Sequence, residues 1–495
     1  MLVCSLSVGL AISAAGGAQG DGNVTVDSTV SDHCVLLGNA VNVVKGTAKA
    51  GCTVTVTFGG STHAGTADAS GNYRVSFDPG GANSSGRVLT VCDGVATKTV
   101  SDVLVGEVWY VSGQSNVAIP MSHQEYVGKV DEWMADIDYP LIRMAIAPAS
   151  AKDPIVWQQV TSANRANVLK MPPLPFFFAK ELHKGKGVPV GITVASVGAT
   201  AIGQWMSAEA IAVAKAENPA CASYGKYTSE YDTARARRFD HVAARAALWY
   251  QGEADGMWGY DNVYAANLRA LINDWRTRRG APGFPVVIPN LAFCKDYTGW
   301  IPVSIAQEEV ARTMANVVCV PQPDLGYNTA RGAYAVSQHP DDKDLLGKRL
   351  YAAVRNLVYG ESDVLYRCPY PQSATYDGNV TVVVKFPDAV RLVQREDSRG
   401  YAATPFRVVT AKGTKMTIEE NAVSIGADGH SLVYTMGWKT TPASVSLYLN
   451  QNAGAFNVKL YDGNGFPVPA FSLAPTTGDD PQPQHRTTGA SVMLY

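Results

Sequence analysis

The stretch GEVWYVSGQSN, residues 106–116, joins an apolar strand to a polar turn. The apolar, β-branched and aromatic residues at 107–111 are typical of a buried strand. Gly113 then permits a tight turn, and Ser115 follows directly after the strand. A serine hydroxyl at such a place can act as a nucleophile when a base and donors for an oxyanion lie nearby. Taken alone, Gly-Gln-Ser-Asn is more often an ordinary turn.

Polar residues gather in a similar way at three more places between residues 105 and 360. VGAT at 197–200 and QGEAD at 251–255 each follow an apolar run, and QHPDDK at 338–343 opens a predicted helix. Strands and helices alternate through this region, which predicts an α/β fold with a parallel sheet covered by helices. Functional sites in such sheets lie at the carboxyl ends of the strands, so we expect these clusters to meet there. The predicted strands are 107–111, 190–194, 246–250 and 285–288, and the predicted helices are 176–183, 264–277 and 343–357.

Each cluster offers a group that nucleophilic catalysis by a serine needs. Gly198 can lend its backbone N–H to an oxyanion, and the side-chain amide of Gln251 can donate to the same atom. Gln114 and Asn116 flank the candidate nucleophile and are expected to orient the substrate, and Glu253 is a further candidate for substrate binding. Each residue also has an ordinary explanation, as a turn residue or as part of the core.

His339 differs from the other seven histidines in its context. It precedes Pro340 at a loop-to-helix junction, late in the same region as Ser115. A lone histidine is more often structural than catalytic, and we expect the other seven to be structural. The order Ser, Gly, Gln and His across successive strand ends is far more specific than any one member of the set.

Length and composition restrict the class of protein. With 495 residues, 46% hydrophobic and 17% charged, the chain is globular and long enough for about three domains. A net charge of -2 and the lack of a Lys/Arg stripe argue against binding to nucleic acid. The expected partner is a neutral or modestly charged small molecule or glycan.

Short β-branched runs separated by Gly, Asn and Asp predict β-sandwich regions on both sides of the α/β region. The predicted organisation is a signal peptide at 1–21, a β-sandwich at 22–104, the catalytic domain at 105–360, a second β-sandwich at 361–475 and a flexible tail at 476–495.

The first twenty residues resemble the apolar core and cleavage zone of a signal peptide, although no Lys or Arg precedes them. The alternative is a frayed N-terminus. With such a signal peptide we expect a secreted or periplasmic protein. No later run is long and apolar enough to span a membrane, so we expect the mature protein to be soluble. The eight cysteines lack metal-ligand spacing, and we predict no metal site. In an exported protein, two of Cys34, Cys52 and Cys92 could form a disulfide; the alternative is small buried thiols.

Together these blocks resemble the SGNH (GDSL-like) hydrolase superfamily, and within it the sialate O-acetylesterase family and the related carbohydrate esterase family six. That group typically reads GEVW-x-x-SGQSNM, PVG-x-I, a Gly-Gly-Thr, WYQGE and HP-x-x-K-x-x-x-G-x-RL. The matching residues here are 106–109 with 112–116, 189–192, 249–253 and 339–350. Weaker similarity extends the resemblance to roughly residues 30–475.

The resemblance implies an SGNH-type sheet and hydrolysis of acetyl esters on sugar hydroxyls without metal or cofactor. It implies that Ser115 is the nucleophile and that His339 is the general base and later acid. The backbone N–H groups of Ser115 and Gly198, with the Gln251 side chain, would form the oxyanion hole. The implied substrate is O-acetylated sialic acid or another acetylated glycan.

This chain departs from the family pattern at three places. Val117 replaces the usual Met, and Ala199 replaces the second Gly of Gly-Gly-Thr. The family commonly places an Asp two or three residues before its His, where this chain has Ser337 and Val336. Asp324, Asp341 and Asp342 lie near His339 in sequence, but none has the expected spacing.

The missing acid leaves two arrangements open: a Ser–His dyad, or another acceptor that orients His339. Of the two, we expect the Ser–His dyad. The alternatives for function are an acetylxylan or other glycan acetylesterase, and, in a different class, an esterase-derived carbohydrate-binding protein with little activity.

Overall fold

The computed structural model describes residues 20–227, 235–292, 299–329, 337–394, 406–418, 422–447 and 460–477. The predicted signal peptide and tail therefore lie outside the described residues, apart from residues 20–21 and 476–477. Val336 lies outside them as well.

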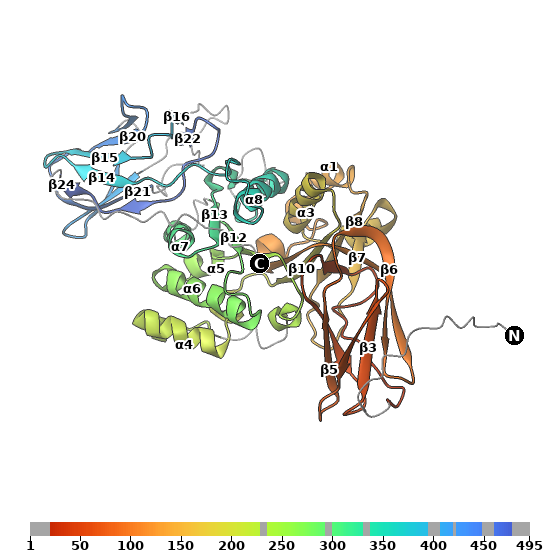
Figure 1. Ribbon diagram of the computed structural model, residues 1–495. Coiled ribbons are helices and arrows are strands. Elements are labelled where there is room, and N and C mark those ends of the chain that lie inside the picture. The colour runs from red at the N-terminus through yellow and green to blue at the C-terminus, as the bar shows by residue number, and fades with distance from the viewer. Residues whose placement is uncertain are drawn as a thin grey trace.

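A parallel sheet forms the centre of the molecule and confirms the predicted α/β fold (Figure 1). Its strands run in the order β13-β12-β11-β7-β10-β8, and β9 pairs antiparallel with β8 at the edge. These strands are nearly continuous runs of buried apolar residues because helices cover both faces of the sheet. The bounds are β7 (Thr97–Gly113), β8 (Tyr139–Ile146), β9 (Trp157–Val160), β10 (Val190–Ser196), β11 (Ala246–Tyr250), β12 (Val286–Pro289) and β13 (Val317–Val320).

Strand β7 lies in the middle of this order, and the chain changes direction on the sheet around it. β8 and β10 lie on one side of β7, whereas β11, β12 and β13 lie on the other. A parallel sheet has its ligand crevice at such a switch point, outside the carboxyl ends of the strands. Gly113, Ser196 and Tyr250 end the three adjacent strands β7, β10 and β11 there, and they pair in register.

Two groups of helices cover the sheet. α3 packs against α8, while α6 packs against both α4 and α7. Figure 1 shows α3 and α8 on one side of the strands and α4 and α6 on the other. The bounds are α1 (Val130–Met134), α2 (Arg165–Val168), α3 (Pro173–Lys186), α4 (Ala208–Glu217), α5 (Glu253–Met257), α6 (Asp261–Arg278), α7 (Trp300–Thr313) and α8 (Lys343–Leu357). Short 3₁₀ helices complete the set: η1 (Ser115–Val117), η2 (Gln124–Tyr126), η3 (Ser162–Asn164), η4 (Ile202–Trp205), η5 (Pro219–Ser223), η6 (Ala236–Phe239) and η7 (Pro323–Leu325).

The N-terminal β region continues directly into the central sheet. The first half of β7 pairs antiparallel with β6, and its second half pairs parallel with β10 and β11. The strand therefore runs unbroken across residues 104 and 105, and one hydrophobic core extends through both regions. The strands are β1 (Val35–Leu37), β2 (Asn42–Thr47), β3 (Thr53–Phe58), β4 (Ser61–Thr66), β5 (Asn72–Phe77) and β6 (Asn83–Cys92).

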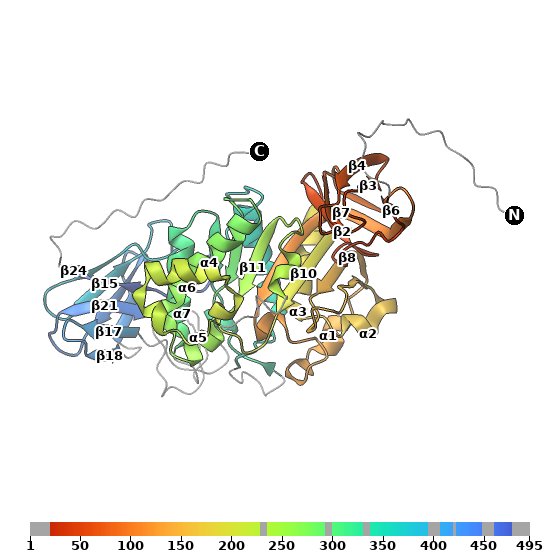
Figure 2. The same cartoon turned by 90° about the horizontal axis from the view of Figure 1, so that it is seen from below.

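The C-terminal β region has a hydrophobic core of its own, to which Ile301 of α7 also contributes. Arg367 joins it to the same helix, because its Nη2 lies 2.8 Å from Oε2 of the buried Glu308. Figure 2 shows the N-terminal and C-terminal strands at opposite ends of the central sheet. The strands are β14 (Ser373–Tyr376), β15 (Thr381–Lys385), β16 (Leu392–Gln394), β17 (Phe406–Thr410), β18 (Lys415–Ile418), β19 (Val423–Ile425), β20 (Ser431–Thr435), β21 (Pro442–Leu447), β22 (Leu460–Asp462), β23 (Ser472–Leu473) and β24 (Thr476–Thr477).

Cys34, Cys52 and Cys92 are free thiols, so the structure favours the alternative in which they form no disulfide. Burial raises the pKa of the Cys34 thiol to about 12, which keeps it protonated and inert. Within the part of the chain that the structure describes, no helix is long and apolar enough to cross a membrane.

Candidate active site

The turn after β7 exposes Ser115 while it buries both neighbours. Gly113 has φ +141°, and a Cβ at this position would collide with the carbonyl oxygen of Tyr250. The same carbonyl accepts a hydrogen bond from the backbone N–H of Gln114 at 3.0 Å, so β11 holds the turn in place. Ser115 then begins η1 and stays partly exposed, whereas Gln114 and Asn116 are buried. The close approach of the two strands explains why a glycine is required here.

Gly198 lies directly beside the serine. A Cβ built on Gly198 would be 3.8 Å from the Ser115 Cβ. The loop after β10 is fastened to the serine loop by the Val197 N–H, which donates to the Gly113 carbonyl at 3.2 Å. The structure thus places Gly198 beside Ser115, as predicted for two loops that follow adjacent strands of a parallel sheet.

The two departures near the serine have different consequences. Val117 is fully buried in the core, where its smaller side chain takes the place of the family's Met. Ala199 has φ +57°, a left-handed conformation in which a Cβ costs about 1 kcal/mol or more. The family's glycine at this position therefore has a physical reason, and alanine here carries backbone strain.

The side chain of Gln251 is fully buried and joins three loops. Its Nε2 lies 2.9 Å from the Thr200 carbonyl oxygen, 3.2 Å from Gln114 Oε1 and 2.6 Å from Asp255 Oδ2. Its Oε1 accepts a hydrogen bond from the Tyr264 hydroxyl at 3.1 Å. These contacts engage the amide within the protein, and donation by Gln251 to an oxyanion stays a prediction.

On the other side of the serine, Asn116 joins two loops that are far apart in the sequence. Its Nδ2 donates to Glu253 Oε1 at 2.6 Å and to the Gln338 carbonyl at 3.0 Å. Its Oδ1 accepts a hydrogen bond from Lys343 Nζ at 2.6 Å. The residue after Ser115 is therefore bonded to the residue before His339, which brings the two predicted catalytic loops together.

Glu253 and Lys343 are both fully buried around Asn116. Burial raises the pKa of the Glu253 carboxyl to about 7, against the hydrogen bond from Asn116 and the charge of Lys343. Burial lowers the pKa of the Lys343 ammonium to about 7. The negative charges of nearby acids, above all Glu253, oppose this shift. The described contacts of Glu253 are with Asn116 and, through its backbone oxygen, with Trp300; its predicted contact with substrate stays a prediction.

Sequence reasoning gave Lys343 no role, although the residue is the lysine of the H-P-x-x-K motif. It begins α8, and its ammonium group reaches back to the serine loop. A lysine at a fixed distance after the candidate base was the available signal. Its burial inside the site could not be inferred from that spacing.

His339 is held by its backbone on both sides. Its N–H donates to Ser337 Oγ at 3.0 Å, and its carbonyl accepts a hydrogen bond from Asn328 Nδ2 at 2.7 Å. Ser337, which replaces the family's aspartate, thus makes a local turn contact. The imidazole is mostly buried, with 12% of the side chain exposed.

The acids near His339 in sequence have other partners. Asp324 pairs with Arg349 through two contacts of 2.8 and 2.6 Å, and Asp342 accepts a hydrogen bond from the Tyr327 hydroxyl. An acid distant in sequence lies beside the ring instead: Glu125 Oε1 is 3.7 Å from His339 Nδ1. Glu125 was not predicted as a site residue, because nothing in its local sequence marks it.

Comparison with known proteins shows the family of this chain. A family described as "carbohydrate esterase, sialic acid-specific acetylesterase" matches residues 105–354, about half of the chain. The chain belongs to this family. The matched residues contain all four strand-end clusters and the parallel sheet that carries them.

The chain is similar to sialate O-acetylesterases of mammals. Those of Pongo abelii and Homo sapiens are each 25% identical over 307 residues, covering 56% of this chain and 58% of theirs. The chain thus spans less than two thirds of the length of these relatives. A carbohydrate acetylesterase from Xanthomonas citri has the same fold, with a TM-score of 0.75 at 24% identity, covering 91% of this chain and 99% of that chain.

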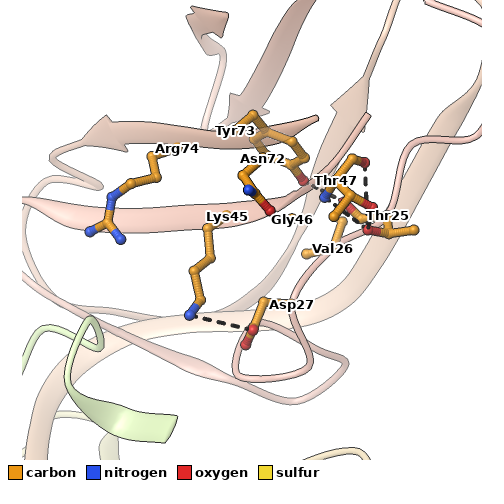
Figure 3. A pocket seen from close by; sticks show the side chains of 9 residues that line it. All are labelled: Thr25, Val26, Asp27, Lys45, Gly46, Thr47, Asn72, Tyr73 and Arg74. Atoms are coloured by element: carbon orange, nitrogen blue, oxygen red, sulfur yellow. Dashed lines mark hydrogen bonds and ion pairs between the residues drawn. The ribbon is translucent and has the colours of Figure 1, made fainter. Parts of the chain in front are cut away.

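A separate pocket of about 360 Å³ lies in the N-terminal β region (Figure 3). Lys45 points toward Asp27, and its Nζ is 3.6 Å from an Asp27 oxygen. The Tyr73 hydroxyl is turned to the backbone, where it donates to the Thr25 carbonyl at 2.6 Å. None of the residues predicted for the acetylesterase-like site lines this pocket.

Proposed function

We propose that this protein is a carbohydrate O-acetylesterase that acts on O-acetylated sialic acid, with Ser115 as nucleophile and His339 as base. The observation that carries the proposal is the chain of contacts around the serine. Gly198 lies beside Ser115, and Asn116 bonds to the backbone that carries His339. Membership of the sialic acid-specific acetylesterase family supports the substrate class.

In the proposed reaction, Ser115 Oγ attacks the acetyl carbonyl carbon while His339 takes the hydroxyl proton. The negative charge on the carbonyl oxygen would be met by the backbone N–H groups of Ser115 and Gly198. The bond from the acetyl carbon to the sugar oxygen then breaks, and His339 returns the proton to that oxygen. Water, deprotonated by the same imidazole, would then attack the acetyl-serine, and as the bond to Ser115 Oγ breaks and acetate leaves, His339 would return the proton to that oxygen.

The first test compares p-nitrophenyl acetate hydrolysis by the wild type, Ser115→Ala and Ser122→Ala. Ser122 is an exposed serine seven positions further along the chain and serves as the matched control. We expect Ser115→Ala to lower kcat by at least about 10³-fold and Ser122→Ala to leave it unchanged. A wild type that is no faster than Ser115→Ala would contradict the proposal.

The second measurement concerns the substrate. Acetate release from O-acetylated sialic acids and from acetylxylan would be followed side by side with the same preparation. Faster release from sialic acid supports the proposal as stated, and faster release from acetylxylan would replace its substrate. Binding of either glycan without turnover would favour the carbohydrate-binding alternative.

A further inference from the structure

We propose that Glu125 supplies the carboxylate that orients His339, in place of the aspartate that the chain lacks. This inference rests on the proposed function of the Ser115–His339 site, which it deepens. Glu125 is a positioning residue in this scheme, because it acts on the imidazole and does not touch the substrate.

The geometry places Glu125 on the correct nitrogen. Its Oε1 is 3.7 Å from His339 Nδ1, a little longer than a hydrogen bond. Catalytic hydrogen bonds are often this long without substrate and shorten in the reacting complex. A carboxylate at Nδ1 fixes the tautomer whose Nε2 is free to accept the serine proton, and it stabilises the imidazolium that then forms.

The position of Glu125 is built into the fold. The backbone carbonyls of Glu125 and His339 both accept hydrogen bonds from the same buried amide, Asn328 Nδ2, at 2.8 and 2.7 Å. The N–H of Glu125 also donates to His123 Nδ1, which caps η2. Two segments remote in sequence are therefore fixed to each other beside the ring, as the preorganisation of a catalytic pair requires.

Burial makes this contact effective. Only 7% of the Glu125 side chain and 12% of the His339 side chain are exposed, so water screens the pair weakly. Other charged and titratable groups also lie near η2 and His339. Asp341 and Glu125 both add to the rise that burial gives the pKa of the Tyr126 hydroxyl. Lys343 Nζ lies 6.0 Å from the centre of the Tyr126 ring.

The experiment compares Glu125→Gln with Glu125→Asp and with Glu132→Gln, an exposed acid on α1 that serves as the matched control. We expect Glu125→Gln to lower kcat/KM by about 10²–10⁴-fold through kcat, with KM little changed. Glu125→Asp should recover part of the loss, and Glu132→Gln should match the wild type. The acidic limb of the pH profile of kcat/KM should move to lower pH in Glu125→Gln, because the imidazolium loses its counter-charge. A purely structural role would not move that limb.

A second readout does not depend on turnover. The titration of the His339 ring, followed by NMR in histidine-labelled protein and assigned with His339→Gln, should shift to lower pH in Glu125→Gln and stay unchanged in Glu132→Gln. An unshifted titration, or kcat/KM within about 3-fold of the wild type, would overturn the role of Glu125. A wild type that is inactive but shows the NMR shift would refute the proposed function and leave the Glu125–His339 coupling established.

Discussion

Gln114 and Asn116 flank the same serine, and both are buried amides, yet their partners differ in kind. Gln114 is used as an acceptor, since its Oε1 receives hydrogen bonds from Gln251 Nε2 and the Ala254 N–H, each at 3.2 Å. Asn116 donates and accepts at once, between the carboxyl of Glu253 and the ammonium group of Lys343. One side of the nucleophile is held by neutral amides, and the other by an acid and a base.

The difference indicates which side is more sensitive to change. Hydrogen bonds to charged groups are worth about 1.5–3 kcal/mol, and those between neutral groups about 1 kcal/mol. The Asn116 side also carries a hydrogen bond from a residue next to Ser115 to the loop of His339. Substitutions on the Asn116 side should therefore lower both stability and activity, whereas substitutions on the Gln114 side should lower mainly stability.

The largest expected effect is that of Asn116→Leu compared with Gln114→Met, two replacements of similar size that remove the amides. Asn116→Leu leaves Glu253 and Lys343 without a shared partner, so we expect a loss of about 3 kcal/mol in the free energy of unfolding. Displacement of the His339 loop should also lower kcat/KM by about 10²-fold. For Gln114→Met we expect a loss of about 1 kcal/mol, because Gln251 keeps its contacts with Thr200 and Asp255.

Both variants would be compared with the wild type by thermal melting and by kcat/KM on p-nitrophenyl acetate. Equal losses of stability in the two would show that the charged partners of Asn116 add nothing, and the contrast between the sides would fail.

A second, smaller effect concerns pH. The pKa of Glu253 is raised by burial to about 7 from 4.5, so the folded protein binds a proton that the unfolded chain has released. Stability from this group is full below pH 4.5 and is lost as the pH rises toward 7. The loss should reach roughly 2–3 kcal/mol and should be absent in Glu253→Gln. Lys343 does not interfere, since its lowered pKa of about 7 changes stability only above that pH, where stability rises.

Asp255 provides the matched measurement on the Gln114 side. Its pKa is raised to about 6 from 3.8, also by burial, so its contribution is lost between those two values. Melting temperatures from pH 4 to pH 7 for the wild type, Glu253→Gln and Asp255→Asn should therefore reveal two overlapping windows, of which the Asp255 window ends at the lower pH. Coincident windows would mean that the two sides titrate as one network.

Much of the fold was predictable, because parallel strands buried on both faces stand out as apolar runs. β10 and β11 were found within two residues of their true ends. β8, β9 and β13 were not, since Pro140 and Arg143 interrupt the first and the other two have four residues each. The sequence also did not predict that β7 continues from the N-terminal β region into the central sheet. A strand's own residues do not show where its pairing partner changes.

The site divides in the same way. Ser115, Gly198 and the loop of His339 were predicted to meet because each follows or precedes a regular element, and topology then brings these points together. The buried contacts of Gln251 and Lys343 depend on the direction of long side chains, which spacing does not determine. Glu125 lies in a segment that is remote from His339 in the sequence. Only the folded chain therefore shows that a carboxylate lies beside the ring and can replace the missing aspartate.

The smallest expected effect concerns Ala199, next to the Thr200 carbonyl that accepts a hydrogen bond from Gln251. With φ +57°, Ala199→Gly should relieve strain, and the extra freedom of glycine in the unfolded chain should offset part of the gain. We expect a net stabilisation below about 1 kcal/mol, with unchanged kcat/KM. Ala201→Gly is the matched control: its φ of -83° is ordinary and its methyl is buried, so the same substitution should destabilise by about 1 kcal/mol. A rise in melting temperature for Ala199→Gly and a fall for Ala201→Gly would show that the Gln114 side tolerates a backbone change that relieves strain. A loss in both would mean that the alanine methyl at 199 itself supports the loop.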